Sequence, residues 1–575
     1  MTRAGATVRH RAASTAVAFR ALARNGPLRL VLLAFLLFAA VELGTWVAIL
    51  LYAYDALDPA AVGAVALVQL LPAGLVAPFA ASLADRYDRR RVLAGGYAAQ
   101  ALALAATAAG ILAGATPPLV IVTGTLAVMA MTITRPTQGS LLPALGRTPT
   151  EVAGANGIAG AVEGIGMLVG PLATAAILLV GGTGHVFLAG ATAAGVAMLL
   201  VAGAGRGTAA TATATTSAGH RHEQRVTQDG SHHDHAHPAD AAHESVLAGL
   251  RVVLANADTR LLVGLLSLRK LVSGALDVLF VLLALEVLGT GGSGAGILSA
   301  ALGLGTLIGG AAAFTLVGRP RLAPAMALAA ALLGVGVMAS GGPLPALLVP
   351  VLIGLAGVGY AGMDVAGRTI LQRATPDAVL GRVLGGLEGS GLVAVAIGSV
   401  LVGPVVALTS VQVAVVTTGL VLLVGILAGW RGLRRIDATV RVPLREIRVL
   451  GAVPAFAPLP PPQLERVAGR ARWQTAEPHE VIIREGDEGD RYYVVESGRV
   501  RVTREGAELR VMGEGEGFGE IALLRNVART ASVTAVDACV LLTLDRHDFL
   551  EVVTGHDQVH EAVERTAVER GATVS

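Results

Sequence analysis

The chain has 575 residues, of which 54% are hydrophobic and only 15% are charged, and its mean hydropathy is +0.66. These values exclude an ordinary soluble protein and indicate a polytopic membrane protein. The net charge of +3 does not favour nucleic-acid binding, because the arginines gather at the ends of apolar segments, where membrane orientation needs them. The single Cys539 excludes an internal disulfide and a cysteine-based metal site, and we expect it to pack inside a β-strand.

Twelve apolar stretches are long enough to cross about 30 Å of hydrocarbon, and they form two sets of six. They lie near 30–53, 60–82, 92–113, 117–134, 153–180 and 186–204, and then near 260–287, 294–317, 323–340, 344–366, 384–407 and 411–430. No cleavable signal peptide is expected, because a turn and another span follow the first stretch. Arg135 precedes Gly170 by the same interval as Arg368 precedes Gly403, which predicts a duplicated six-helix unit.

Positive charge is distributed unevenly between the connecting loops. The arm at 1–28 carries several arginines and no acid, and the even-numbered loops carry more arginines, among them Arg135 and Arg368. The odd-numbered loops contain neither Lys nor Arg. This asymmetry predicts a multi-pass plasma-membrane protein with both termini, the central linker and the C-terminal domain in the cytoplasm.

Five ionisable residues inside the predicted spans are functional candidates, because a charge in hydrocarbon is costly. They are Glu42, Glu163, Arg269, Lys270 and Asp277. The three carboxylates could carry protons, since burial raises a carboxyl pKa toward neutrality. Either basic residue could pair with one of them or hold an anionic substrate. The alternative is a static ion pair or a side chain that reaches out to the membrane surface.

A polar segment at 206–246 separates the two predicted halves. It contains a histidine-rich tract with His220, His222, His232, His233, His235, His237 and His243. Its composition cannot bury a core, so we expect a disordered cytoplasmic linker. A weak zinc or nickel site is the alternative, because imidazole is a good ligand for both metals.

The loop at 81–91, which reads Ala-Ser-Leu-Ala-Asp-Arg-Tyr-Asp-Arg-Arg-Arg, resembles the Gly-x-Leu-x-Asp-Arg-x-Gly-Arg-Arg loop of the major facilitator superfamily. The resemblance covers about 25–435 and implies twelve transmembrane helices in two halves, 29–205 and 247–435. It implies that Asp85 latches the cytoplasmic side by meeting the positive end of a helix. The charged surroundings would be Arg86, Arg89 and Arg90. Ala81 and Asp88 stand where the family has glycine.

Further segments resemble the efflux-type branch of this superfamily. They are Arg135 to Pro143, the Ala155-Asn156 pair, and Gln372 to Asp377 with Gly381 to Val383. Their resemblance implies export of a small molecule rather than uptake.

After Trp430 the sequence changes to charged turns and short β-like runs, which predicts a soluble domain at 448–570 behind a basic connector at 436–447. The glycine and aromatic spacing at 482–498 and the pattern at 518–535 resemble the β-roll and phosphate cassette of cyclic nucleotide-binding domains. The resemblance implies a β-roll with flanking helices. The amphipathic segment 546–570 is expected to cap the bound base.

The same resemblance implies a binding site for cAMP or cGMP. Its residues would be Gly519, Glu520, Ile521, Ala522, Leu523, Arg529, Thr530 and Ala531. Arg529 offers a permanently charged guanidinium to the cyclic phosphate, next to backbone amides near Ala522 and Leu523. Glu520 accepts a hydrogen bond from the ribose 2′-hydroxyl, and Gly519 leaves room for the sugar. Thr530 matches some cGMP-preferring domains, yet we favour cAMP. A β-roll that keeps the pattern without binding nucleotide is the alternative.

These features predict a secondary transporter that exports a small molecule and is regulated by a cytoplasmic cyclic nucleotide, with protons as a candidate coupling ion. We expect no cofactor, no metal site, no nucleic-acid partner and no enzymatic activity, because the sequence shows no nucleophile–base set or phosphotransfer loop. Two alternatives stay open. One is a non-transporting, membrane-anchored cyclic nucleotide receptor, and the other is a lysophospholipid transporter of the same fold.

Overall fold

A computed structural model describes residues 25–59, 61–145, 149–204, 251–313, 319–439, 443–457, 459, 461–554 and 557–572. Within the helices, no side chain is described for 75, 77–86, 139–140, 142–145 and 149–161, nor for several shorter stretches. The chain divides into two compact units. The first is helical and holds most of the chain up to Val440, and the second consists mainly of Arg441–Ser575.

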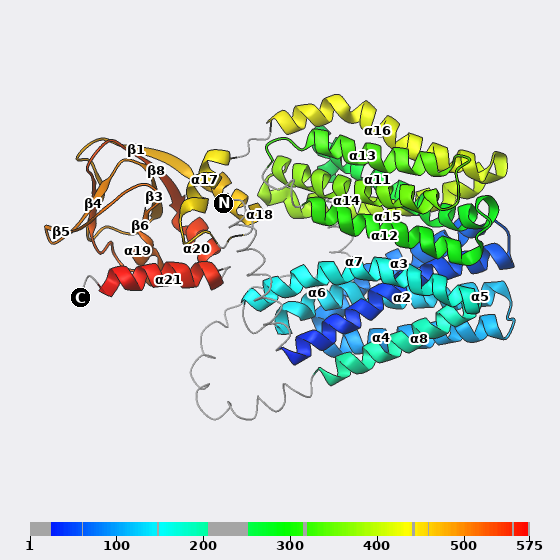
Figure 1. Ribbon diagram of the computed structural model, residues 1–575. Helices are drawn as coiled ribbons and strands as arrows, with labels where there is room; N and C mark the ends of the chain where they lie inside the picture. Colours follow the sequence, from blue (N-terminus) through cyan, green and yellow to red (C-terminus); the bar gives the residue numbers. More distant parts are fainter. Residues whose placement is uncertain are drawn as a thin grey trace. The chain divides into compact units, whose positions relative to one another are not determined.

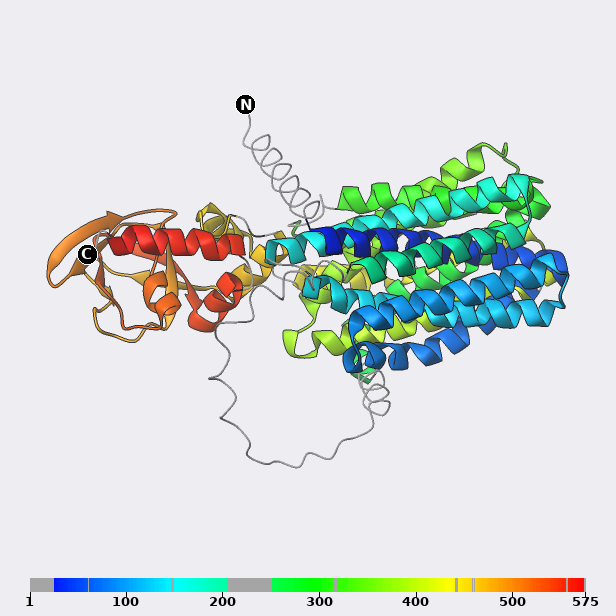
Figure 2. The same ribbon diagram turned by 90° about the horizontal axis from the view of Figure 1, so that it is seen from below.

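Long helices fill the first unit and run side by side in two groups (Figures 1 and 2). The first group is α2 (Gly26–Ala56), α3 (Ala61–Arg86), α4 (Arg89–Leu112), α5 (Pro117–Met131), α6 (Thr134–Leu145), α7 (Pro149–Val180) and α8 (Thr183–Gly203). The second is α11 (Ala257–Leu282), followed by the π-helical turn η1 (Leu283–Val287), α12 (Gly291–Ala313), α13 (Ala323–Ser340), α14 (Leu348–Ala374), α15 (Asp377–Leu408) and α16 (Val411–Thr439).

Ten membrane-spanning segments can be recognised among the described residues by length and composition. In α3 only Ala61–Gly74 is a described apolar stretch, which is short for a span. In α11 the apolar stretch carries Arg269, Lys270 and Asp277. The many apolar helices confirm a polytopic α-helical protein, and the count of twelve spans stays a prediction.

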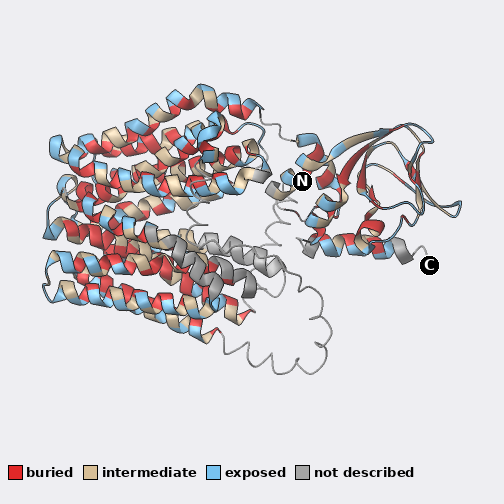
Figure 3. Cartoon of the chain, turned by 180° about the vertical axis from the view of Figure 1, so that it is seen from behind, coloured by how far each residue is buried: buried red, intermediate tan, exposed pale blue. Residues whose placement is uncertain are grey.

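The two groups of helices meet at several places, and two of these seams are α3 against α15 and α7 against α12. Glycine allows the backbones to approach closely there. A Cβ atom on Gly63 would lie 2.4 Å from the carbonyl oxygen of Ser399, and one on Gly303 would lie 2.6 Å from that of Met167. Buried residues gather between the helices, while exposed ones lie on the outer faces (Figure 3). The seams therefore rest on backbone contact.

The second unit is a β-roll of two four-stranded antiparallel sheets, which confirms the predicted β-roll with flanking helices. One sheet has the order β1 (Arg472–Ala476), β8 (Cys539–Asp545), β3 (Arg491–Ser497), β6 (Gly517–Phe518). The other has the order β2 (Val481–Ile483), β7 (Ser532–Ala535), β4 (Val500–Arg504), β5 (Ala507–Met512). The helices are α17 (Leu444–Ala452), α18 (Pro461–Arg470), α19 (Glu520–Arg525), α20 (Arg546–Thr554) and α21 (Asp557–Ala572).

Strand β3 is buried on both faces and separates two apolar clusters. On one face Tyr492 stacks on Phe549 of α20, with ring centroids 4.6 Å apart. On the other face Tyr493 stacks on Phe518, with centroids 5.1 Å apart, inside the roll. Adjacent residues of a strand point to opposite faces, so this strand joins the helical layer to the interior of the roll.

The residues predicted as a separate connector, 436–447, belong in part to helices. Helix α16 continues to Thr439, because Leu433 and Ile436 are buried and extend its apolar face. Helix α17 begins at Leu444. The segment between the two helices is therefore only 440–443.

Cys539 lies in β8 and is buried, as expected from the sequence. Burial raises the pKa of its thiol, so the folded state keeps it protonated. This contribution to stability is present below the unfolded pKa of about 8.5 and is lost as the pH rises through the folded-state pKa. We expect maleimide at pH 7 to label the folded protein at least ~100-fold more slowly than the urea-unfolded protein. Equal labelling rates, measured by mass spectrometry, would contradict the buried position.

Candidate functional site

A cavity of about 530 Å³ lies in the β-roll beneath α19 and α21. Seven of the eight predicted cassette residues line it, namely Gly519, Glu520, Ile521, Ala522, Arg529, Thr530 and Ala531. Apolar side chains from the strands, including Val502, Leu509 and Met512, complete the wall. A cavity with apolar walls and a few converging polar groups is the usual form of a small-molecule site.

Leu523 is the eighth predicted residue, and it does not line this cavity. Its side chain is 1% exposed and packs with Tyr492 and Phe549 in the helical apolar cluster. Leu523 therefore anchors α19 to the roll, because a helix of this length must bury its apolar side against a neighbour.

Gly519 determines the position of Arg529. It has a φ of +91° and begins the turn into α19, a left-handed conformation that glycine adopts without steric cost. A Cβ atom here would lie 2.7 Å from Nη1 of Arg529. The sequence suggested that this glycine makes room for the sugar. The structure adds that it leaves room for the guanidinium of Arg529, and the room for the sugar stays a prediction.

Arg529 is 5% exposed, and its guanidinium contacts backbone carbonyls and one carboxylate around the cavity. Nη1 donates to the carbonyl oxygen of Gly519 at 3.0 Å, and Nη2 donates to that of Arg491 at 2.8 Å. Nη2 also lies 3.3 Å from Oδ1 of Asp490, which is its ion-pair partner. The sequence pattern did not single out Asp490. This residue lies in the loop between β2 and β3, and only the fold brings it close to Arg529.

Glu520 is the first residue of α19 and is 3% exposed. From α21, Thr566 and Glu569 reach the same cavity. The apolar residues of the C-terminal helices do not do so. Phe549, Val559 and their neighbours are buried in the helical cluster instead. The C-terminal segment therefore presents polar side chains to the cavity, and its capping of a bound base stays a prediction.

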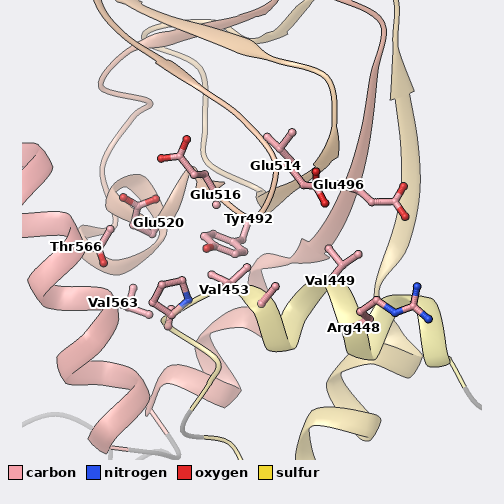
Figure 4. A pocket seen from close by; sticks show the side chains of 16 residues that line it. Arg448, Val449, Val453, Tyr492, Glu496, Glu514, Glu516, Glu520, Val563 and Thr566 are labelled. Atoms are coloured by element: carbon pink, nitrogen blue, oxygen red, sulfur yellow. The ribbon is translucent and has the colours of Figure 1, made fainter. Parts of the chain in front are cut away.

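A second cavity, of about 680 Å³, adjoins Glu520 from the other side. Figure 4 shows Val449 and Val453 of the α17 segment on one side of Tyr492, and Val563 and Thr566 of α21 on the other. Glu520 and Thr566 line both cavities. Helix α17 thus lines the second cavity, and Glu520 of α19 lies between this cavity and the first.

In the helical unit, Arg135 bridges two of the candidate carboxylates. Nη2 lies 2.7 Å from Oε2 of Glu42 in α2, and Nη1 lies 2.7 Å from Oε1 of Glu163 in α7. The guanidinium also lies over the ring of Phe38, 5.8 Å from its centroid. The sequence assigned Arg135 to a loop. This was wrong, since Arg135 belongs to the first turn of α6 and its charge is balanced by helices on either side.

The second half has its own cluster of charges, centred on Asp364. Arg269 lies 2.6 Å from Asp364 and stacks on Tyr360, 4.1 Å from the ring centroid. Arg368 pairs with Asp364 at 3.1 Å and with Glu388 at 2.7 Å. Arg368, like Arg135, was assigned to a loop and lies inside a helix. The shared interval in the repeat was the signal that could have identified both arginines.

The other candidates in the helical unit are more dispersed. Asp277 lies in α11 in the neighbourhood of Trp46 and Lys270. Within the described residues, the hydrogen bonds of Arg90 go to the backbone. It donates to the carbonyl oxygens of Val201, at 3.0 Å, and Ala202, at the C-terminal end of α8. Arg89 is exposed. The side chains of Asp85 and Arg86 lie outside the described residues, so the latch stays a prediction.

Comparisons with known proteins agree with both units. Residues 30–357 match the Major Facilitator Superfamily, and 473–556 match the cyclic nucleotide-binding domain. The first match covers more than half of the chain, so the chain belongs to the Major Facilitator Superfamily. It carries a cyclic nucleotide-binding domain at its C-terminal end.

Two similar curated proteins match this chain over short stretches. A cAMP-dependent protein kinase regulatory subunit of Yarrowia lipolytica is 46% identical over 74 residues, which is 13% of this chain and 20% of that protein. The human potassium/sodium hyperpolarization-activated cyclic nucleotide-gated channel 4 is 32% identical over 123 residues, 21% of this chain and 10% of the channel. The chain therefore spans a fifth or less of the length of these relatives.

Among solved structures, the Thermus thermophilus catabolite activator protein is 31% identical, with 21% of this chain and 59% of that chain covered and a TM-score of 0.20. PKAR CBD2 bound to Sp-2Cl-cAMPS is 26% identical, with 22% and 88% covered and a TM-score of 0.20.

Proposed function

We propose that the chain is a secondary transporter whose alternating access is biased by cAMP or cGMP bound in the β-roll. The observation that carries this proposal is the cavity that holds both Glu520 and Arg529, two charged residues that are almost fully buried. A cavity lined by one buried cation and one buried carboxylate can hold a small ligand that carries both a phosphate and a hydroxyl group. A cyclic nucleotide offers a phosphate to Arg529 and a ribose hydroxyl to Glu520. The kinase regulatory subunit among the relatives favours cAMP.

For transport, Arg135 with Glu42 and Glu163 is the candidate coupling site. One cation serves two carboxylates on different helices, and both carboxylates are about one-third exposed. The excess negative charge suits a proton or a cationic substrate. Arg269, Lys270 and Asp277 are candidates for the second half. Export of a small molecule and the latch role of Asp85, with Arg86, Arg89 and Arg90, rest on sequence resemblance.

The orientation in this proposal places both termini, the central linker and the β-roll in the cytoplasm of a cell whose plasma membrane holds the transporter. The loop charges support it, because arginine occurs in alternate loops. Cyclic nucleotide in the cytoplasm would then reach the β-roll.

Calorimetric titration of the full-length protein in lipid nanodiscs tests the regulatory part. We expect saturable one-site binding of cAMP or cGMP, and no binding of 5′-AMP, whose phosphate has a different position and charge. Absence of heat with both cyclic nucleotides would refute regulation by these ligands. Charge-neutralising substitution of Glu42, Glu163 and Asp277 tests the transport part. If none of the three changes the cellular phenotype, the receptor function is favoured instead.

In the wild-type protein, the carboxylate of Asp490 competes with the phosphate of the nucleotide for the guanidinium of Arg529. We therefore expect removal of its charge to strengthen cyclic nucleotide binding. Asp490→Asn keeps the shape and removes the negative charge. The Asp490 side chain is 66% exposed, so solvent screens much of the effect. We expect a roughly 2- to 5-fold tighter dissociation constant at low salt, with a smaller gain at high salt. Weaker binding by this variant would instead mean that Asp490 serves mainly to position Arg529.

A further inference from the structure

The last helix of the transporter ends in a carboxylate that is buried against a neighbouring helix. Asp437 of α16 is 6% exposed. Its Oδ1 accepts a hydrogen bond from the backbone N–H of Leu322 at 3.0 Å, and Oδ2 accepts one from that of Ala323 at 2.9 Å. These two amides begin α13, whose own N-cap residue, Leu322, has no side chain that could accept them. Asp437 is therefore the N-terminal cap of α13, supplied from another helix.

A second contact fixes the same end of α16. Arg435 pairs with Asp258, which lies in the first turn of α11. Within three residues, the end of α16 thus holds the starts of two other helices of the second half. A displacement of this end would therefore disturb the first turn of both α11 and α13.

The corresponding place in the first half is built differently. There α4 is capped by its own Asp88, which accepts from the N–H of Arg91 at 2.8 Å. The repeat places Ala204, at the end of α8, at the position equivalent to Asp437. The carboxylate supplied from the last helix is therefore present only in the half that continues into the cyclic nucleotide-binding domain.

The segment from α16 to α17 is short, and α17 itself is held to the β-roll by side-chain contacts. Only 440–443 lie between the two helices, and four residues reach at most about 14 Å. In the β-roll unit, the guanidinium of Arg445 lies 4.2 Å from the ring centroid of Trp473 and pairs with Glu496. Trp473 donates from Nε1 to Glu446 at 2.8 Å. Helix α17 also lines the second cavity, which shares Glu520 with the nucleotide cavity.

We infer that Asp437 is the positioning residue through which cyclic nucleotide occupancy acts on the transporter. The inference rests on the proposed function, because it requires the nucleotide to bind near Glu520 and move α17. A short tether passes this movement to the end of α16, and Asp437 passes it to the N-terminus of α13. The bound and free states then differ in how well α13 is capped, which is the differential interaction that allostery requires.

Hydrogen–deuterium exchange of the full-length protein in nanodiscs tests this without a known transport substrate. We expect saturating cAMP to change the exchange rates of the Leu322 and Ala323 amides in the wild-type protein. In Asp437→Ala these amides should exchange about 2- to 30-fold faster, as for loss of a helix cap, and should no longer respond to cAMP. The amides at the start of α4 are the internal reference and should not respond.

Asp88→Ala is the matched control, because it removes a carboxylate cap of the same kind from the first half. It should speed exchange at Arg91 and leave the cAMP response at Leu322 and Ala323 intact. Calorimetry on the same samples separates the two failures. If cAMP binds but the wild-type amides at α13 exchange equally with and without it, the inference is overturned. If cAMP and cGMP do not bind at all, the proposed function itself fails. The wild-type comparison stands even if Asp437→Ala does not fold.

Discussion

Arg529→Glu is expected to abolish cyclic nucleotide binding to the full-length protein at concentrations that saturate the wild type. Arg529 is the buried cation of the cavity, and each charge-assisted hydrogen bond to a phosphate contributes about 1.5–3 kcal/mol. The substitution removes these bonds and places a negative charge next to the phosphate. We expect the dissociation constant to rise by at least ~100-fold, measured by calorimetry in nanodiscs.

Arg525→Glu is the matched control, since it makes the same charge change at an exposed position near the end of α19. It should bind nucleotide normally. Arg529 also donates to two backbone carbonyls, so Arg529→Glu could disturb the fold. The maleimide reactivity of Cys539 reports this, because the thiol stays protected only while the roll is folded. A variant with protected Cys539 and wild-type affinity would show that Arg529 is not the phosphate ligand.

Arg135→Gln is expected to destabilise the transporter unit more than any other single substitution of an exposed or half-buried arginine in this protein. It would leave Glu42 and Glu163 facing each other without their shared cation. Removing one partner of a fully buried pair costs about 3–5 kcal/mol, and the partial exposure here reduces this to about 1–3 kcal/mol. Thermal unfolding in nanodiscs should show a clearly lower midpoint.

The triple variant Glu42→Gln, Arg135→Gln, Glu163→Gln should recover much of this loss, because no uncompensated charge remains. Arg431→Gln, at an exposed position of α16, is the control and should leave the midpoint unchanged. If the triple variant is less stable than Arg135→Gln alone, the carboxylates contribute through contacts other than their ion pairs.

The sequence predicted the β-roll well because its turns require particular residues. Gly486 and Gly498 both have a φ of +89°, which side chains rarely tolerate, so their spacing carries structural information. The cassette residues were predictable for the same reason, since Gly519 is also left-handed. Asp490 was not predictable, because its role depends on two loops meeting in space.

The charges of the helical unit were harder to interpret. Hydropathy falls at Thr134, so Arg135 resembled a loop residue, yet a new helix begins there and tolerates Pro136 in its first turn. Arg368 is four residues from its partner Asp364 on the same helix, a spacing that predicts contact. Hydropathy alone cannot distinguish a charge that ends a helix from one that is neutralised within the bundle.

The seams at Gly63 and Gly303 have a mechanical consequence. Where two helices interlock through long side chains, sliding requires each side chain to leave one rotamer and find another. At these seams a bare Cα faces a carbonyl oxygen, so little has to be rearranged when one half rolls against the other. A single methyl group at either glycine would act as a wedge, since it would lie about 2.5 Å from that oxygen. Easy movement of the two halves along these seams thus depends on the absence of a Cβ atom at Gly63 and Gly303.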